Sequence, residues 1–141
     1  MTTNSHLASD LRLAVGRVAR KIRQSESAGL TPSQVSALVA VEQLGHARVS
    51  DIAVLESVSA PTVTRIVANL EDAGLLSRAD DPSDRRSSRV TLTAKGAAAL
   101  HHMRTERTAY LQLRLAELSR GEREVLTAAV PILAKIAGDP R

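Results

Sequence analysis

The chain of 141 residues has no cysteine, no tryptophan and no phenylalanine, and Tyr110 is its only aromatic side chain. Without a thiol it can form no disulfide, thiolate nucleophile, thiol redox sensor or cysteine zinc site. With one aromatic ring it lacks the stacking platforms that read RNA loops and single strands. We therefore expect an aliphatic core and, if the chain binds a nucleic acid, duplex DNA.

Lysine and long apolar runs are also scarce. Only three of the 19 basic residues are lysines, and the formal net charge is +4 with a pI near 10.3. Positive charge carried by arginine is well suited to binding phosphates and narrow DNA grooves. A GC-rich genome also favours arginine over lysine, so this preference alone does not indicate DNA binding. No apolar run approaches the ~20 residues that span a bilayer, and the polar start has no signal-peptide core. We expect a cytoplasmic protein with no membrane partner.

Apolar periodicity and helix-ending residues divide the chain into successive elements. They are a helix from Leu7 to about Gln24, a helix capped by Thr31 and Gln34 and closed by Gly45, a short helix capped by Ser50, a helix capped by Ser59 and closed by Gly74, strands at 75–78 and 89–93, a long helix after Thr93, and a last helix capped by Ser119 and Glu122. This order predicts a mainly α fold with a small β-ribbon, a winged helix-turn-helix flanked by terminal helices. We expect a single domain over 1–141, with a DNA-binding lobe at about 31–96 and flanking helices at about 5–25 and 97–138.

The segment from Asp81 to Arg89 is dense in charge and turn-forming residues and leads directly into an alternating strand. Such a loop places Arg85, Arg86 and Arg89 at the end of a two-stranded ribbon, where guanidinium groups suit a DNA minor groove. Asp84, two residues before Arg86, can hold that guanidinium in one rotamer. A merely solvated loop is the alternative.

The helix from Ser59 to Gly74 has one apolar and one polar face. The apolar face contains Val63, Ile66, Val67 and Leu70, and Thr62, Thr64 and Arg65 lie on or beside the polar face. A helix of this kind after a tight turn fits the major groove, where Arg65 can form paired hydrogen bonds with guanine. An ordinary amphipathic surface helix has the same pattern.

Four motifs together resemble the MarR family of winged-helix transcriptional regulators. They are Thr62-Val63-Thr64-Arg65, Leu70-Glu71-x-x-Gly74-Leu75, Asp81-Pro82-x-Asp84-x-Arg86 and Val90-x-Leu92-Thr93-x-x-Gly96. The resemblance covers Thr31 to about Leu100 in detail, and the flanking helices by length and apolar stripe. It implies a homodimer with interlocked terminal helices that represses nearby genes until a ligand, oxidant or metal releases it.

The resemblance also implies roles for individual residues. Thr62, Thr64 and Arg65 would lie in the major groove, Arg86 would enter the minor groove with Asp84 orienting it, and Arg85 and Arg89 would support phosphate contacts. Ser50 and Ser59, at helix N-termini, are candidate phosphate ligands through their backbone amides as well as their hydroxyls.

Dimerisation is also expected from the apolar stripes alone. The terminal helices carry faces that a winged-helix body of roughly 60 residues cannot cover, and exposed stripes of that size mark interfaces. A two-fold dimer should read an inverted repeat in double-stranded DNA, with half-sites about 10 base pairs apart. The expected function is a sequence-specific transcriptional regulator, a repressor relieved by an unidentified small-molecule effector. The alternatives are a protein-interaction winged-helix module, and an activator or architectural DNA binder.

Motifs for other chemistries are missing. The sequence has no phosphate-cradling glycine loop and no nucleophile elbow, so we expect no enzyme, no catalytic residue and no cofactor. His101, His102 and Glu106 are metal-ligand types close in sequence. Adjacent residues on a helix point about 100° apart, so only one histidine can share a face with Glu106. We expect no metal site there.

Overall fold

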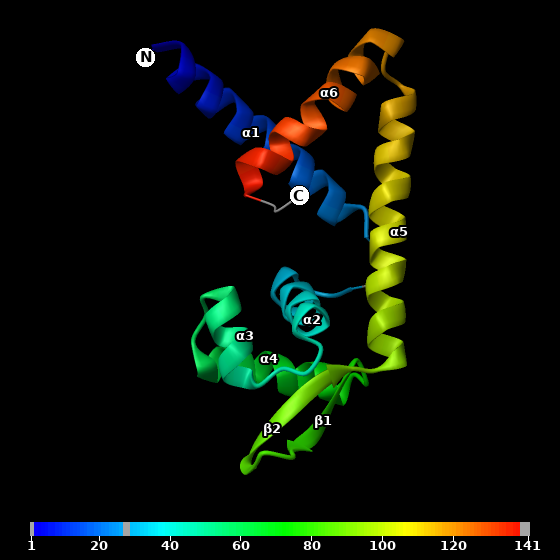
Figure 1. The fold of residues 1–141 in the computed structure, drawn as a ribbon. Coiled ribbons are helices and arrows are strands. Elements are labelled where there is room, and N and C mark those ends of the chain that lie inside the picture. Colours follow the sequence, from blue (N-terminus) through cyan, green and yellow to red (C-terminus); the bar gives the residue numbers. More distant parts are fainter. Residues whose placement is uncertain (1, 27–28, 139–141) are drawn as a thin grey trace. The chain divides into compact units, whose positions relative to one another are not determined.

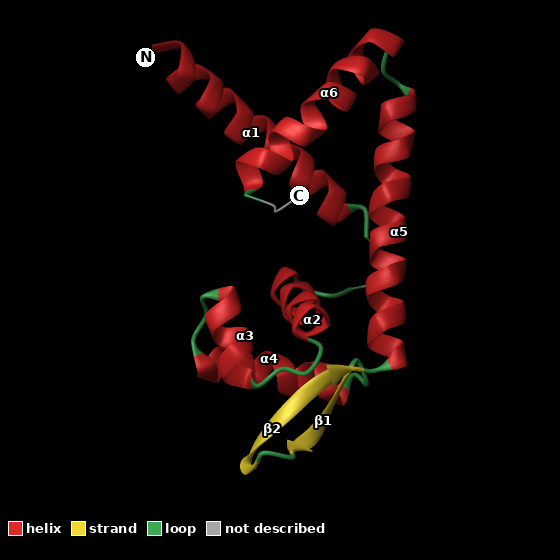
Figure 2. Ribbon diagram, in the orientation of Figure 1, coloured by secondary structure: helices red, strands yellow, loops and turns green. Residues whose placement is uncertain are grey.

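The computed structural model describes residues 2–26 and 29–138, and for Thr2 and residues 84–87 it describes the backbone alone. The described residues form six helices and one two-stranded sheet (Figures 1 and 2). They are α1 (Thr2–Gln24), α2 (Pro32–Leu44), α3 (Val49–Glu56), α4 (Ala60–Asp72), β1 (Leu76–Asp81), β2 (Asp84–Leu92), α5 (Ala94–Ala116) and α6 (Arg120–Ala137). The predicted mainly α fold with a small β-ribbon is confirmed.

The chain forms two compact units. The first, here called the lobe, is Glu26–Thr105 and contains α2, α3, α4, the ribbon and the first half of α5. The second, the terminal unit, combines Met1–Ser25 with Glu106–Arg141. The lobe includes all of the predicted winged-helix segment at 31–96.

Two helices begin with the capping boxes that the sequence predicted. At α2, the Thr31 hydroxyl accepts a hydrogen bond from the Gln34 amide, and the Gln34 side chain accepts one from the Thr31 amide. Ser119 and Glu122 exchange the same two bonds at the start of α6. Each box satisfies two amides that have no partner within the helix.

The start of α3 differs from the prediction. Ser50 lies inside the helix, and the N-cap position belongs to Arg48, whose amide donates to the Asp51 carboxylate at 3.1 Å. The predicted serine cap is therefore wrong, because Asp51 occupies the position from which a carboxylate can reach back to the cap amide. The first helix also extends further than predicted and begins at Thr2.

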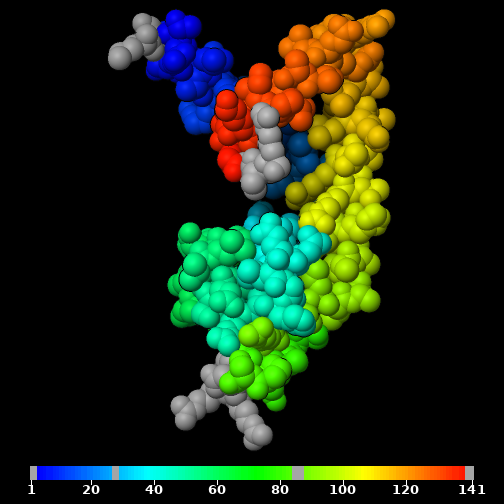
Figure 3. Space-filling view, in the orientation of Figure 1, coloured from blue at the N-terminus to red at the C-terminus, as the bar shows by residue number. Residues whose placement is uncertain are grey.

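The core of the lobe is aliphatic, as expected for a chain with one aromatic ring. The side chains of α2, α3 and α4 adjoin one another in the space-filling view (Figure 3). The largest apolar side chains that are fully buried are Leu38, Val41, Ile52, Val67, Leu70, Val90 and Leu100. Leu100 comes from α5, so the first half of that helix belongs to the core of the lobe.

The ribbon is longer than predicted. β1 and β2 pair antiparallel from Leu76 opposite Leu92 to Asp81 opposite Asp84, with a register shift after Asp80. The predicted loop over 79–88 is therefore wrong: Pro82 and Ser83 form the tip, and Arg85 and Arg86 lie on β2. Alternation was hidden from the sequence because polar and charged residues occupy both faces of this part of the ribbon.

A glycine allows the base of the ribbon to pack against α5. A Cβ atom at Gly96 would lie 2.1 Å from the carbonyl oxygen of Leu75, which is far inside van der Waals contact. Thr93 caps α5 by accepting from the Gly96 amide, and its hydroxyl donates to the carbonyl of Gly74. The close approach of the Leu75 carbonyl therefore explains why the motif has glycine at position 96, where a side chain would clash.

The terminal unit exposes apolar side chains along its helices. No residue of α6 is buried, and Val125, Val130, Ile132 and Ile136 are each more than half exposed. On α1, Leu7 and Val18 are exposed in the same way.

Among the described helices, none combines the length and the hydropathy that a bilayer-spanning segment requires.

Candidate nucleic-acid interface

The helix-turn-helix consists of α3 and α4, joined through Ser57, which adopts a left-handed conformation. On α4, Val63, Val67 and Leu70 are buried against the lobe. Thr64 and Arg65 are exposed on the side of α4 away from this core. The predicted division of the helix into an apolar and a polar face is therefore confirmed.

The threonines and serine at the start of α4 are held by short-range hydrogen bonds. Ser59 occupies the N-cap position, but its hydroxyl bonds to the Thr62 hydroxyl at 2.8 Å and accepts no hydrogen bond from the backbone. Thr64 donates its hydroxyl hydrogen to the carbonyl of Ala60 at 2.9 Å. Thr64 can therefore offer a partner only its methyl group and oxygen lone pairs.

Arg65 stands apart from the other arginines of the lobe whose side chains are described. It is exposed and forms no ion pair or hydrogen bond within the described residues. The others have internal carboxylate partners: Arg48 and Arg89 bind Asp81, Arg78 binds Glu71, and Arg104 binds Glu42. Arg65 is therefore the arginine in this group whose donors are all open to an external acceptor.

A buried carboxylate ties the ribbon to the helix-turn-helix. The Asp81 side chain is 1% exposed, and its Oδ2 atom accepts from Arg48 Nη2 at 2.6 Å and from Arg89 Nε at 3.1 Å. Its Oδ1 atom accepts from the amide and the hydroxyl of Ser83 at 3.0 and 2.7 Å. One carboxylate thus holds the ribbon tip, strand β2 and the N-cap residue of α3.

These bonds favour the charged form of Asp81. Its pKa lies well below the ordinary value of 3.8, chiefly because the Ser83 hydroxyl and amide donate to it, with further contributions from Arg48 and Arg89. Burial acts in the opposite direction and is outweighed. Asp81 is therefore ionised at neutral pH and can keep both guanidinium groups in place.

The remaining predicted residues fall into two groups. The side chains of Asp84, Arg85 and Arg86 lie outside the described residues, and their backbone belongs to β2. Ser50 and Ser59 are exposed in or beside the first turns of α3 and α4. DNA contacts by all five residues stay predictions.

Two important residues were missed by the sequence analysis. Asp81 is part of the quoted motif but has no predicted role, and nothing in the sequence pattern singles out Arg48. The bond between them joins positions 33 residues apart, so no local pattern could indicate it. Arg89 was predicted to support phosphate contacts, and its bond to Asp81 adds a structural role that was not anticipated.

Metal-ligating side chains do not gather in the described part of the chain. No group of three or more His, Cys, Asp or Glu side chains is placed there so as to hold a metal ion. His101 and His102 lie on α5, and Thr105 donates its hydroxyl hydrogen to the carbonyl of His101.

A helix-turn-helix with an open arginine on its second helix, followed by a hairpin anchored to the first, defines a winged-helix DNA-binding protein. The model of the MarR family matches residues 30–88. An uncharacterized HTH-type transcriptional regulator of Mycobacterium bovis is 34% identical over 140 residues, covering 99% of this chain and 98% of its own. The HTH-type transcriptional repressor MdtR of Bacillus subtilis is 31% identical, covering 97% of this chain and 90% of its own.

Solved structures agree with this assignment. A transcriptional regulator protein from Pseudomonas aeruginosa superposes with a TM-score of 0.88 at 30% identity, covering 99% of both chains. MepR of S. aureus, solved as a mutant bound to an oligodeoxyribonucleotide, has the same fold with a TM-score of 0.73 at 22% identity, covering 93% of this chain and 97% of its own. The chain belongs to the MarR family, and it is a DNA-binding transcriptional regulator, not an enzyme.

Proposed function

We propose that the chain is a homodimeric repressor that binds an inverted repeat in double-stranded DNA and releases it when a small molecule lowers its affinity. The observation that carries this proposal is the open Arg65 on the exposed face of α4. A free guanidinium on the second helix of a helix-turn-helix is placed to read a guanine edge or to bind a phosphate.

The start of α4 supports the same mode of binding. Because the Ser59 hydroxyl bonds to Thr62, it does not satisfy a backbone amide of the first turn. Amides at a helix N-terminus bind phosphate oxygens well, since the helix dipole adds to their partial positive charge. We propose that Ser59 and Ser50 lie against the DNA backbone, and that Thr62, Thr64 and Arg65 face the major groove.

The hairpin supports a second, separate contact. Its tip is fixed by the Asp81 carboxylate, so the next residues along β2 are carried on an anchored ribbon. We propose that Arg86 enters the minor groove, that Asp84 orients it, and that Arg85 and Arg89 strengthen the phosphate contacts. A ribbon held in place before binding loses less conformational entropy than a free loop.

The apolar faces of the terminal unit support the homodimer. Helix α6 exposes Val130, Ile132 and Ile136 by 62%, 60% and 66%, which a soluble helix seldom does without a partner. A second copy of the chain carries the same faces and can cover them in a two-fold interface. Two copies of α4 related in this way would read two half-sites on one side of the duplex.

Repression is supported by the relationship to MdtR, whose name describes a transcriptional repressor. Its opposite, activation through the same contacts, differs only in where the operator lies relative to the promoter. Regulation of transcription requires access to the chromosome, so the proposed location is the cytoplasm.

Footprinting on the DNA that flanks the gene of this protein tests the proposal. We expect two protected half-sites, related by two-fold symmetry and about 10 base pairs apart from centre to centre, overlapping a promoter. A single asymmetric site would contradict the dimer, and a site upstream of the promoter that raises transcription would contradict repression.

A further inference from the structure

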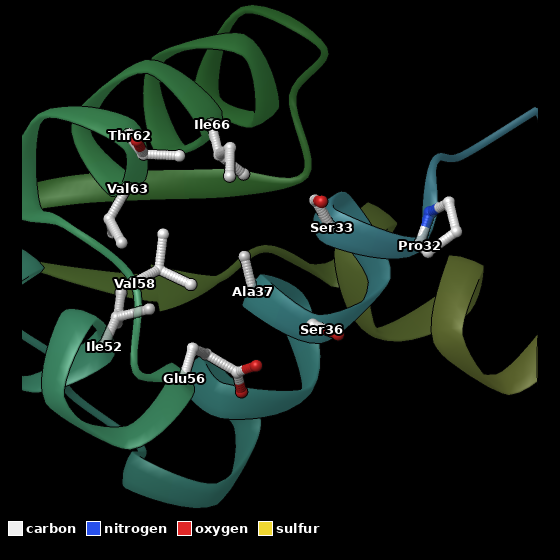
Figure 4. Close-up of a pocket in the computed structure, with 10 residues that line it drawn as sticks. All are labelled: Pro32, Ser33, Ser36, Ala37, Ile52, Glu56, Val58, Thr62, Val63 and Ile66. Atoms are coloured by element: carbon white, nitrogen blue, oxygen red, sulfur yellow. The ribbon is translucent and has the colours of Figure 1, made fainter.

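A hollow lies inside the lobe between α2, α3 and α4, with a volume of about 230 Å³ (Figure 4). One wall is apolar and includes Ile52, Val63 and Ile66. Ser36 and Thr62 also line it. This volume is below the range of about 300 Å³ and more in which drug-sized ligands bind, so the hollow suits a body of about one ring.

Glu56 places one carboxylate in this hollow. It is the last residue of α3, it is half-buried, and in Figure 4 its side chain extends from α3 toward α2. Within the described residues, the Glu56 carboxylate forms no ion pair or hydrogen bond. An unpaired, partly desolvated carboxylate among apolar side chains is a favourable partner for a cation.

The helix itself adds to the unfavourable position of this charge. The C-terminus of a helix carries partial negative charge, which repels a carboxylate in the last turn. Helix α3 has no basic residue in its last turn to compensate. A bound cation would therefore relieve two unfavourable interactions at Glu56 at once.

We propose that this hollow binds a small organic cation. The ammonium group of the ligand would pair with the Glu56 carboxylate, and its apolar body of about one ring would pack against Ile52, Val63 and Ile66. A neutral or anionic molecule of the same shape fits the apolar wall but lacks the ion pair. The site therefore selects for positive charge.

The site is coupled to the recognition helix by direct contact. Thr62, Val63 and Ile66 belong to α4 and line the hollow, and Arg65 lies between two of them in sequence. A ligand in the hollow contacts α4 through these three residues, so it lowers DNA affinity if it binds more tightly when α4 is in a position where Arg65 does not fit the groove. This regulatory step, unlike the binding itself, rests on the proposed DNA-binding function.

The first experiment measures ligand binding by calorimetry on the full chain without DNA. The probes are phenethylammonium, its neutral analogue 2-phenylethanol and the anion phenylacetate. We expect the cation to bind roughly three- to tenfold more tightly than the alcohol, as for a partly exposed ion pair, and the anion to bind most weakly. Equal affinity for the three probes would overturn the proposal.

Two variants locate the charge that selects the cation. Glu56→Gln keeps the volume of the side chain and should remove the preference for phenethylammonium over 2-phenylethanol. Asp72→Asn, the matched control, makes the same charge change at an exposed position on α4 outside the hollow and should keep the preference. A Glu56→Gln protein that retains the preference, or an Asp72→Asn protein that loses it, would refute the site.

The second experiment tests whether cation binding in the hollow lowers DNA affinity, separately from whether the cation binds at all. Duplex binding is measured by fluorescence anisotropy with and without saturating phenethylammonium, and we expect DNA affinity to fall about fivefold in the wild type and not in Glu56→Gln. Cation binding that depends on Glu56 in a chain that binds no duplex would uphold the site and refute the proposed function. Duplex binding that saturating cation leaves unchanged would refute the coupling.

Discussion

Substitution of Gly96 by alanine tests whether the base of the ribbon packs against α5 as closely as described. The new Cβ atom would lie 2.1 Å from the Leu75 carbonyl oxygen and 3.3 Å from Leu92 Cδ2. The Leu75 carbonyl accepts from the Thr93 amide at 3.1 Å, so any shift that relieves the clash weakens that bond. Overpacking costs roughly 1–3 kcal/mol and a hydrogen bond about 1, while the helix propensity of alanine offsets about 1. We expect Gly96→Ala to lower the free energy of unfolding by about 1–3 kcal/mol.

A matched control is available in α6. Gly121 is also in the first turn of a helix, but a Cβ atom there would meet nothing within 4 Å. Gly121→Ala should therefore leave stability unchanged or raise it by up to about 1 kcal/mol. Urea unfolding followed by circular dichroism, at one protein concentration, compares both variants with the wild type. A Gly96→Ala protein as stable as Gly121→Ala would refute the close packing.

Two further predictions concern the terminal unit and the ribbon anchor. Val130→Asp should shift the chain from dimer to monomer in sedimentation, whereas Val54→Asp, the same change at an exposed valine on α3, should leave the dimer intact; equal behaviour would count against the proposed interface. Asp81→Asn should destabilise the lobe at neutral pH, and exposed Asp80→Asn should not. Because folding depresses the pKa of Asp81, its contribution is complete above the unfolded value of 3.8 and is lost as the pH falls below it, so the gap between wild type and Asp81→Asn should shrink in acid. A gap in unfolding free energy that stays constant down to pH 2 would show that ionisation of Asp81 is irrelevant.

Features set by neighbouring residues were predictable from the sequence. The capping boxes of Thr31 and Ser119 require partners only three positions away, so their spacing was enough to locate two helix starts. The faces of α4 follow from helical periodicity, which correctly separated Val63 and Val67 from Arg65. The open state of Arg65 could not be predicted, because it depends on where every carboxylate of the lobe lies.

Features that depend on distant residues were not predictable. The Asp81 carboxylate meets Arg48 across 33 positions of sequence, and neither residue lies on a periodic stripe. The length of the ribbon was underestimated because its outer part is polar on both faces. The hollow at Glu56 requires three helices to be placed relative to one another, so no single segment of the sequence contains a signal for it.

The most direct test of the central claim is the salt dependence of binding to a duplex that contains the footprinted site. We expect the logarithm of the affinity to fall linearly with the logarithm of the salt concentration, with a slope of about −0.9 for each phosphate neutralised. Arg65→Ala should weaken binding by about 1–3 kcal/mol, while Arg120→Ala, which removes the same charge from an exposed position on α6, should change it little. No binding in dilute buffer, or equal losses in the two variants, would contradict a regulator that reads DNA through α4.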